Sequence, residues 1–115
     1  MFSLFSTGKK INEFAKELAD GLSKRYPPAL DVSAEKKISA NRLTKVLEDT
    51  LSNAAEFQRQ HRLGVFGKAK LGNEFKWQLK ELGYTDKFVE VATEGLMVYV
   101  TRGAAHADSA PAEKN

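Results

Sequence analysis

The sequence predicts an all-α fold, a small four-helix domain over residues 1–102 with a tail over residues 103–115. Four segments carry apolar side chains at spacings of three and four residues, which is the period of an amphipathic helix. Short connections that contain proline or glycine separate these segments. The chain has 115 residues and no cysteine, so it fits one domain that folds without disulfides.

The first predicted helix covers residues 9–25. The second begins at residue 39 or 41 and ends at residue 61. Ile11, Phe14, Leu18 and Leu22 form one stripe on the first, which should end before Tyr26 because two prolines follow. Residues 27–38 are expected to be a connection. The second helix should begin at a polar cap, and its apolar stripe includes the residues Leu43, Val46, Leu47, Leu51, Ala54 and Phe57.

The third predicted helix begins at residue 68 or 73 and ends at residue 82. Its stripe consists of Leu71, Phe75, Leu79 and Leu82, and Gly83 should close it. We expect residues 63–67 to form the preceding bend. Gly64 is expected to supply the left-handed residue that ends the second helix.

The segment 87–102 allows two interpretations. A full helical stripe of apolar residues and a start at Thr85-Asp86 favour a fourth helix. The alternative is a C-terminal β-hairpin with a turn at Glu94-Gly95, giving three helices and two strands, the order found in winged-helix DNA-binding domains. The helix is preferred because a hairpin would place Glu90 on the same strand face as Phe88.

Residues 103–115 contain no large apolar side chain, so burial cannot offset their ordering entropy, and we expect a disordered tail. The sequence has no apolar run long enough for a membrane span. The positive charges of Lys9 and Lys10 follow the short apolar stretch at the N-terminus instead of preceding it, so we do not expect a signal peptide. Phe2, Leu4 and Phe5 could extend the first helix into a membrane anchor, but packing against the core is the preferred interpretation. A cytoplasmic location is therefore expected.

Signals of catalysis or metal binding are sparse. The absence of cysteine excludes thiol catalysis and cysteine-ligated metal clusters. His61 has no carboxylate at helical spacing, and we expect it to interact with the carbonyl groups at a helix end. The run from Gly64 to Lys68 has two glycines three residues apart but lacks the Ser or Thr of a nucleotide-binding loop, so a helix end with a bend is expected. We expect no enzymatic activity, no cofactor and no metal.

The positive charge is concentrated in one part of the chain. Residues 58–80 carry six cations and one acid, a local charge of +5 within a total of +3, so the other residues sum to −2. Trp77 lies among these cations, about 200° around the helix from Phe75 at about 100° per residue. Because tryptophan is usually well buried, we expect Trp77 to pack against another helix, with the lysines extending around it.

If Trp77 is exposed instead, it marks a binding surface. The candidate interaction face consists of Arg59, Arg62, Lys68, Lys70, Lys76, Trp77 and Lys80. Because aromatic residues and arginine are enriched at protein interfaces, the face predicts an interaction module with a protein partner. The alternative is nucleic acid, with the indole stacked on a base and the cations on phosphates.

The stretch from Leu71 to Tyr84, followed by Phe88-Val89 and the run from Ala92 to Leu96, resembles small uncharacterised (hypothetical) proteins of β-proteobacteria. The resemblance covers residues 26–102. It implies a bacterial cytoplasmic setting and assigns neither an activity nor site residues.

Overall fold

The computed structural model describes residues 2–33 and 38–113, with side chains from residue 7 to residue 101. Across these residues it contains only helices: α1 (Phe2–Arg25), α2 (Pro28–Val32), α3 (Ala40–Leu51), α4 (Asn53–Gln60), α5 (Val65–Leu82) and α6 (Asp86–Glu113). The predicted all-α fold is confirmed, and the alternative β-hairpin is wrong because residues 87–101 lie within α6.

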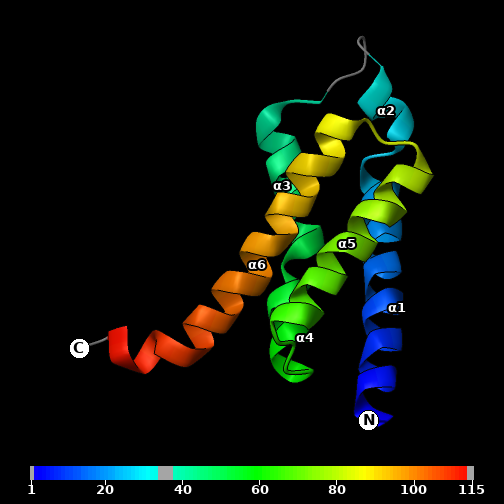
Figure 1. Ribbon diagram of the computed structural model, residues 1–115. Coiled ribbons are helices and arrows are strands. Elements are labelled where there is room, and N and C mark those ends of the chain that lie inside the picture. Colours follow the sequence, from blue (N-terminus) through cyan, green and yellow to red (C-terminus); the bar gives the residue numbers. More distant parts are fainter. Residues whose placement is uncertain (1, 34–37, 114–115) are drawn as a thin grey trace.

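The four predicted helices form a ring around one core (Figure 1). α1 packs most extensively against α5, α5 also packs against α6, and α6 packs against α3 and α4. α3 closes the ring against α1. Phe14 of α1 and Phe57 of α4 stack with their ring centroids 4.0 Å apart, so α1 also contacts α4.

Prolines and a serine break the first half of the chain. α1 ends at Arg25, as the following prolines predict, and Pro28 opens the short α2, where its fixed φ suits a first helical position. The second predicted helix occurs as α3 and α4, with a break at Ser52. Its start is as expected, because the Ser39 hydroxyl accepts a hydrogen bond from the Arg42 backbone N–H at 3.1 Å.

The bend between α4 and α5 differs from the prediction. The left-handed residue is Arg62, with φ of 52°, and not Gly64, whose backbone is extended. The Leu63 N–H donates to the Gln58 carbonyl at 3.0 Å and the Leu63 side chain is buried, as in a Schellman-type helix end. Gly64 instead caps α5, which therefore begins at Val65, earlier than predicted.

The end of α5 and the start of α6 follow the prediction. Gly83 has φ of 100°, and its N–H donates to carbonyls of the last turn of α5. The Thr85 hydroxyl accepts from the Phe88 N–H at 3.2 Å, which caps α6. α6 then runs to Glu113, so its backbone helix extends over the segment 103–113 for which the sequence predicts disorder. Residues 114 and 115 lie outside the described residues.

The predicted stripes supply the core. Phe75 and Leu79 of α5, Leu22 of α1, Leu51 of α3 and Leu96 of α6 are all fully buried. Close packing at the centre leaves the opposite sides of these helices exposed. The outward side of α5 is the part of the surface that concerns function.

Candidate interaction surface

Trp77 is exposed, contrary to the expectation that it packs against another helix. Its side chain is 58% exposed, whereas Phe75 and Leu79 on either side of it in the sequence are fully buried. The helix geometry explains the difference, since Trp77 lies about 200° from Phe75 and so faces away from α1 and α6. The general tendency of tryptophan to be buried is overridden by its position on the helix.

A second aromatic side chain lies on the same side of α5. Phe66 is 90% exposed, and at about 100° per residue it lies only about 20° around the helix from Trp77, about 16 Å along the axis. Lys70, Asn73 and Lys80 continue the same row and are exposed. We call this row, Phe66, Lys70, Asn73, Trp77 and Lys80, the outer face of α5.

Sequence reasoning missed Phe66 because it placed residues 63–67 in a bend. Once α5 begins at Val65, the spacing of 4, 3, 4 and 3 residues along the outer face has the period of a helix. That spacing is the signal that finds Phe66. A start at residue 68 hides it.

The seven predicted face residues do not form one continuous face. Lys70, Trp77 and Lys80 lie together on the outer face of α5. Lys76 lies at its side, in a groove between α5 and α6 that has a volume of about 430 Å³ and is also lined by Glu90 and Glu94.

The other three predicted residues lie near the start of α5. Lys68 is half-buried, on the opposite side of the helix from Trp77. Arg62 is exposed in the α4–α5 turn. Arg59 forms an ion pair with Glu56 on α4. The predicted face therefore divides into the outer face of α5 and a group of cations near the α4–α5 turn.

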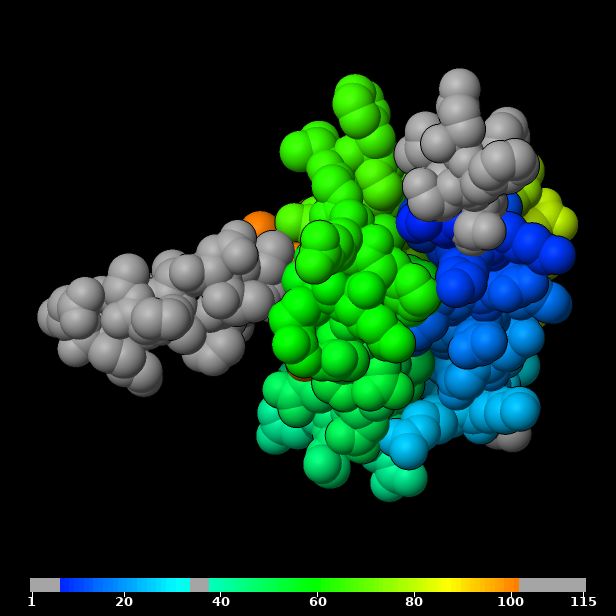
Figure 2. Space-filling model, turned by 90° about the horizontal axis from the view of Figure 1, so that it is seen from below, coloured from blue at the N-terminus to red at the C-terminus, as the bar shows by residue number. Residues whose placement is uncertain are grey.

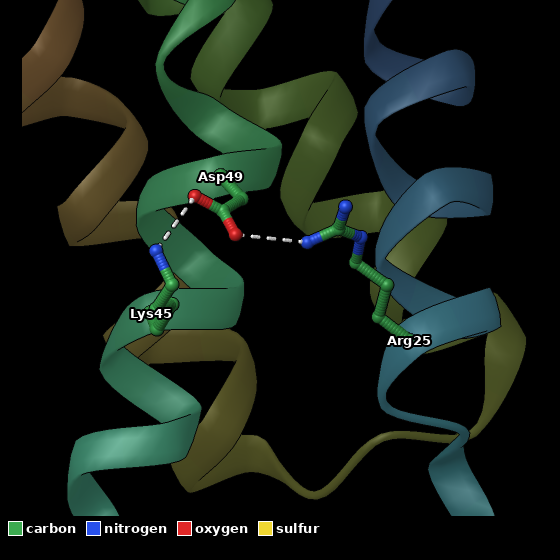
Figure 3. Close-up of polar contacts among 3 residues, drawn as sticks. All are labelled: Arg25, Lys45 and Asp49. Atoms are coloured by element: carbon green, nitrogen blue, oxygen red, sulfur yellow. Dashed lines mark hydrogen bonds and ion pairs between the residues drawn. The ribbon is translucent and has the colours of Figure 1, made fainter.

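Ion pairs in the described residues hold some cations of the bundle but not the exposed lysines of α5. On the other side of the bundle, Asp49 lies between Arg25 at 3.1 Å and Lys45 at 3.8 Å and joins α1 to α3 (Figure 3). Among the described residues, Lys70, Lys76 and Lys80 have no ion pair within 4.0 Å. Their charge is available to a ligand.

A polar cluster that the sequence did not reveal joins α2 to the α5–α6 turn. The Asp31 carboxylate accepts from the Thr85 N–H at 2.7 Å and from the Tyr26 hydroxyl at 3.1 Å. The Tyr84 hydroxyl donates to the Tyr26 carbonyl at 2.6 Å. Two of these three hydrogen bonds join residues 54 and 58 positions apart in the chain, so no local pattern could find the cluster.

Burial and the neighbouring carboxylate raise the pKa of both phenols of this cluster. Burial, followed by the hydrogen bond to Asp31, raises the pKa of Tyr26 to about 12. Burial and the negative charge of Asp31 also raise the pKa of Tyr84. Tyr26, Asp31, Thr85 and Phe88 line one side of a cavity of about 440 Å³. Because both oxygens of Asp31 accept hydrogen bonds from the chain, the cluster holds α2 against the start of α6.

Two further sequence signals have local roles. The ring centroids of His61 and Phe57 lie 4.4 Å apart. The backbone N–H of His61 donates to the Phe57 carbonyl at the end of α4. Gly64 and Gly67 belong to the cap and first turn of α5, where a Cβ on Gly67 would lie 3.3 Å from the Leu63 side chain. In the described part of the chain, no group of three or more metal-ligating side chains comes together.

No helix in the described residues is long and apolar enough to cross a membrane. None of the protein families, curated proteins or solved structures compared with the chain matches it. The resemblance to small β-proteobacterial proteins stays a prediction.

Proposed function

We propose that this protein is a non-enzymatic helical interaction module of the bacterial cytoplasm that binds a protein partner through the outer face of α5. The observation that carries the proposal is the exposure of Trp77, whose side chain is 58% exposed. Trp77 shares the outer face of α5 with Lys70 and Lys80, and the other side of α5 forms part of the core. Tryptophan contributes more than most residues to binding free energy at protein interfaces.

The charges of the face indicate the chemistry of the partner. Lys70 and Lys80 have no ion pair with the described residues, so an acidic partner surface would gain their charge without breaking an internal contact. Phe66 and Trp77 would supply apolar anchors about 16 Å apart along the helix. A partner with two apolar sites, one acidic residue between them to meet Lys70 and another beyond them to meet Lys80, fits this arrangement.

The test is quantitative capture of partners from nuclease-treated bacterial lysate by tagged wild-type protein and by single variants. Trp77→Ala and Lys80→Glu should each lose the captured partner. Two variants serve as matched controls, Val32→Ala for an exposed apolar residue on α2 and Lys24→Glu for an exposed cation on α1. Equal capture by wild type and Trp77→Ala would contradict the proposal.

Nucleic acid is the alternative ligand, and the same exposed indole among free lysines favours it. Because residues 87–101 lie within the helix α6, this segment forms no β-hairpin that could act as the wing of a winged-helix domain. Nucleic-acid binding through Trp77 and the lysines predicts an affinity for single-stranded or duplex oligonucleotides that falls steeply as the salt concentration is raised. Titrating both at low ionic strength distinguishes the alternatives, since a protein interaction module should bind neither.

A further inference from the structure

The start of α5 carries the most exposed apolar side chains of the described chain. Val65 is 81% exposed and Phe66 is 90% exposed. They follow Leu63 directly, and the buried Leu63 side chain fixes the turn to the core. We call Val65 and Phe66 the apolar tip. Two adjacent exposed apolar residues with polar residues around them form a small patch of the kind that can mark an interaction site.

Cations flank this tip in the chain. Exposed Arg62 precedes it in the turn, exposed Lys70 follows on the side of Phe66, and half-buried Lys68 follows on the opposite side of α5. In the described residues none of the three has an ion pair. α5 begins with no acidic residue in its first turn and with no side-chain cap, so no side chain of its own first turn or cap offsets the positive end of its dipole.

The tip lies at one end of the bundle, beside the beginning of α1 (Figure 1). A Cβ built on Gly8 of α1 would lie 3.6 Å from Cε of Lys70, which confirms that the two segments are neighbours. Lys9 and Lys10 come next on α1 and are exposed. Seen from this end, the green segment around the start of α5 projects from the surface next to the blue helix α1 (Figure 2).

We propose that this end of the bundle docks on an anionic lipid bilayer, with Val65 and Phe66 inserted at the headgroup boundary and the exposed cations Arg62 and Lys70 on the headgroup phosphates. An apolar side chain that is nine-tenths exposed projects outward and does not line a groove, so it suits insertion into a deformable phase. A collar of unpaired cations around an apolar tip is the charge pattern of peripheral membrane proteins. Phe66 and Lys70 also belong to the outer face of α5, whereas Trp77 belongs neither to the tip nor to its cations. The inference needs only the tip, so it does not rest on the proposed protein partner.

The test is co-sedimentation of the full chain with lipid vesicles. One set contains phosphatidylcholine alone, and the other contains equimolar phosphatidylcholine and phosphatidylglycerol. We expect binding to the anionic vesicles only, and weaker binding as salt rises from low to physiological concentration.

Variants at the tip and its collar locate the contact. Phe66→Ser should lower the partition coefficient about tenfold, since it removes an inserted ring. Arg62→Glu should lower it by at least about tenfold, since it replaces an attraction by a repulsion. Val32→Ser and Lys24→Glu, at exposed sites on α2 and the end of α1, should bind as wild type does. All these sites are exposed, and circular dichroism confirms that each variant is folded.

Three outcomes would overturn the proposal: no binding to anionic vesicles, equal binding to both kinds of vesicle, and undiminished binding of Phe66→Ser. The Trp77→Ala variant separates this inference from the proposed function. Loss of partner capture with unchanged vesicle binding means that the two surfaces act independently. Absence of vesicle binding leaves capture through Trp77 unaffected.

Discussion

Replacing Asp31 by alanine should destabilise the fold more than any other substitution of a charged side chain in the described residues. The carboxylate accepts the Thr85 N–H at 2.7 Å and the Tyr26 hydroxyl at 3.1 Å, and it joins α2 to the turn before α6. Alanine leaves both donors without this acceptor. Asp31→Ala tests whether the polar cluster holds these segments together.

The magnitude follows from the two contacts. A hydrogen bond to a charged group contributes about 1.5–3 kcal/mol, and the half-buried position of Asp31 lets water replace part of it, so we expect a loss of about 2–3 kcal/mol. Asp31→Asn keeps one acceptor oxygen and should lose about half as much. Asp20→Ala is the matched control, because Asp20 forms an exposed ion pair with Lys16 at 3.8 Å that contributes at most about 0.5 kcal/mol.

The assay is urea unfolding followed by circular dichroism, with the free energy taken from the midpoint at constant slope. If Asp31→Ala unfolds at the same urea concentration as Asp20→Ala, the cluster contributes nothing to stability and the reasoning is refuted. Loss in the alanine variant with partial recovery in the asparagine variant supports the hydrogen-bond account.

Three other predictions concern stability. The first concerns the two left-handed residues. Arg62→Gly should raise the free energy of unfolding by about 1 kcal/mol, because glycine adopts the φ of 52° found at Arg62 at lower cost. Gly83→Ala should lower the free energy of unfolding by about 1–2 kcal/mol, because alanine is strained at the φ of 100° found there, and urea midpoints that move in the opposite directions would contradict both expectations. Phe75→Ala should cost about 3–5 kcal/mol, since the ring is fully buried between helices, and a loss under about 1 kcal/mol would show that the core is loosely packed. Alkaline pH should destabilise the fold. Below pH 10 the phenols are neutral in both the folded and the unfolded protein. Above pH 10 the unfolded chain loses its phenolic protons, whereas Tyr26 in the folded protein keeps its proton until about pH 12. Urea midpoints should therefore fall from about pH 10 to 12, and less so in Tyr26→Phe; an equal fall in both would show that Tyr26 is not responsible.

The periodic part of the fold was predictable because amphipathic stripes record which side of a helix is buried. Phe75 and Leu79 are buried as their spacing predicts, and Gly83 closes α5 in the left-handed conformation that glycine adopts at low cost. The helix at 87–101 was also predictable, since Glu90 is exposed on α6 as the helical stripe requires.

The turn before α5 was not predictable from residue types. The preference for glycine at left-handed positions indicated Gly64, but Arg62 adopts this conformation. The buried side chain of Leu63, the residue after Arg62, and the hydrogen bond from the Leu63 backbone N–H to the Gln58 carbonyl fix this turn. Tertiary packing of Leu63 thus outweighs the local cost at Arg62.

The candidate site was predictable in part. The helical wheel placed Trp77 away from the core, and the concentration of cations indicated its surroundings. Which cations lie beside it depended on where α5 begins and on how α4 ends. Arg59 and Lys68 are separated from Trp77 for these reasons, and Phe66 joins it.

The most direct test of the central proposal uses the fluorescence of Trp77, which is the only tryptophan of the chain. Acrylamide quenching should be measured on the free protein, on the urea-unfolded protein and on the captured complex. We predict that the free, folded protein is quenched nearly as well as the unfolded chain and that partner binding protects the indole. Weak quenching in the free protein, or equal quenching with and without the partner, would contradict the proposal that Trp77 is an exposed binding contact.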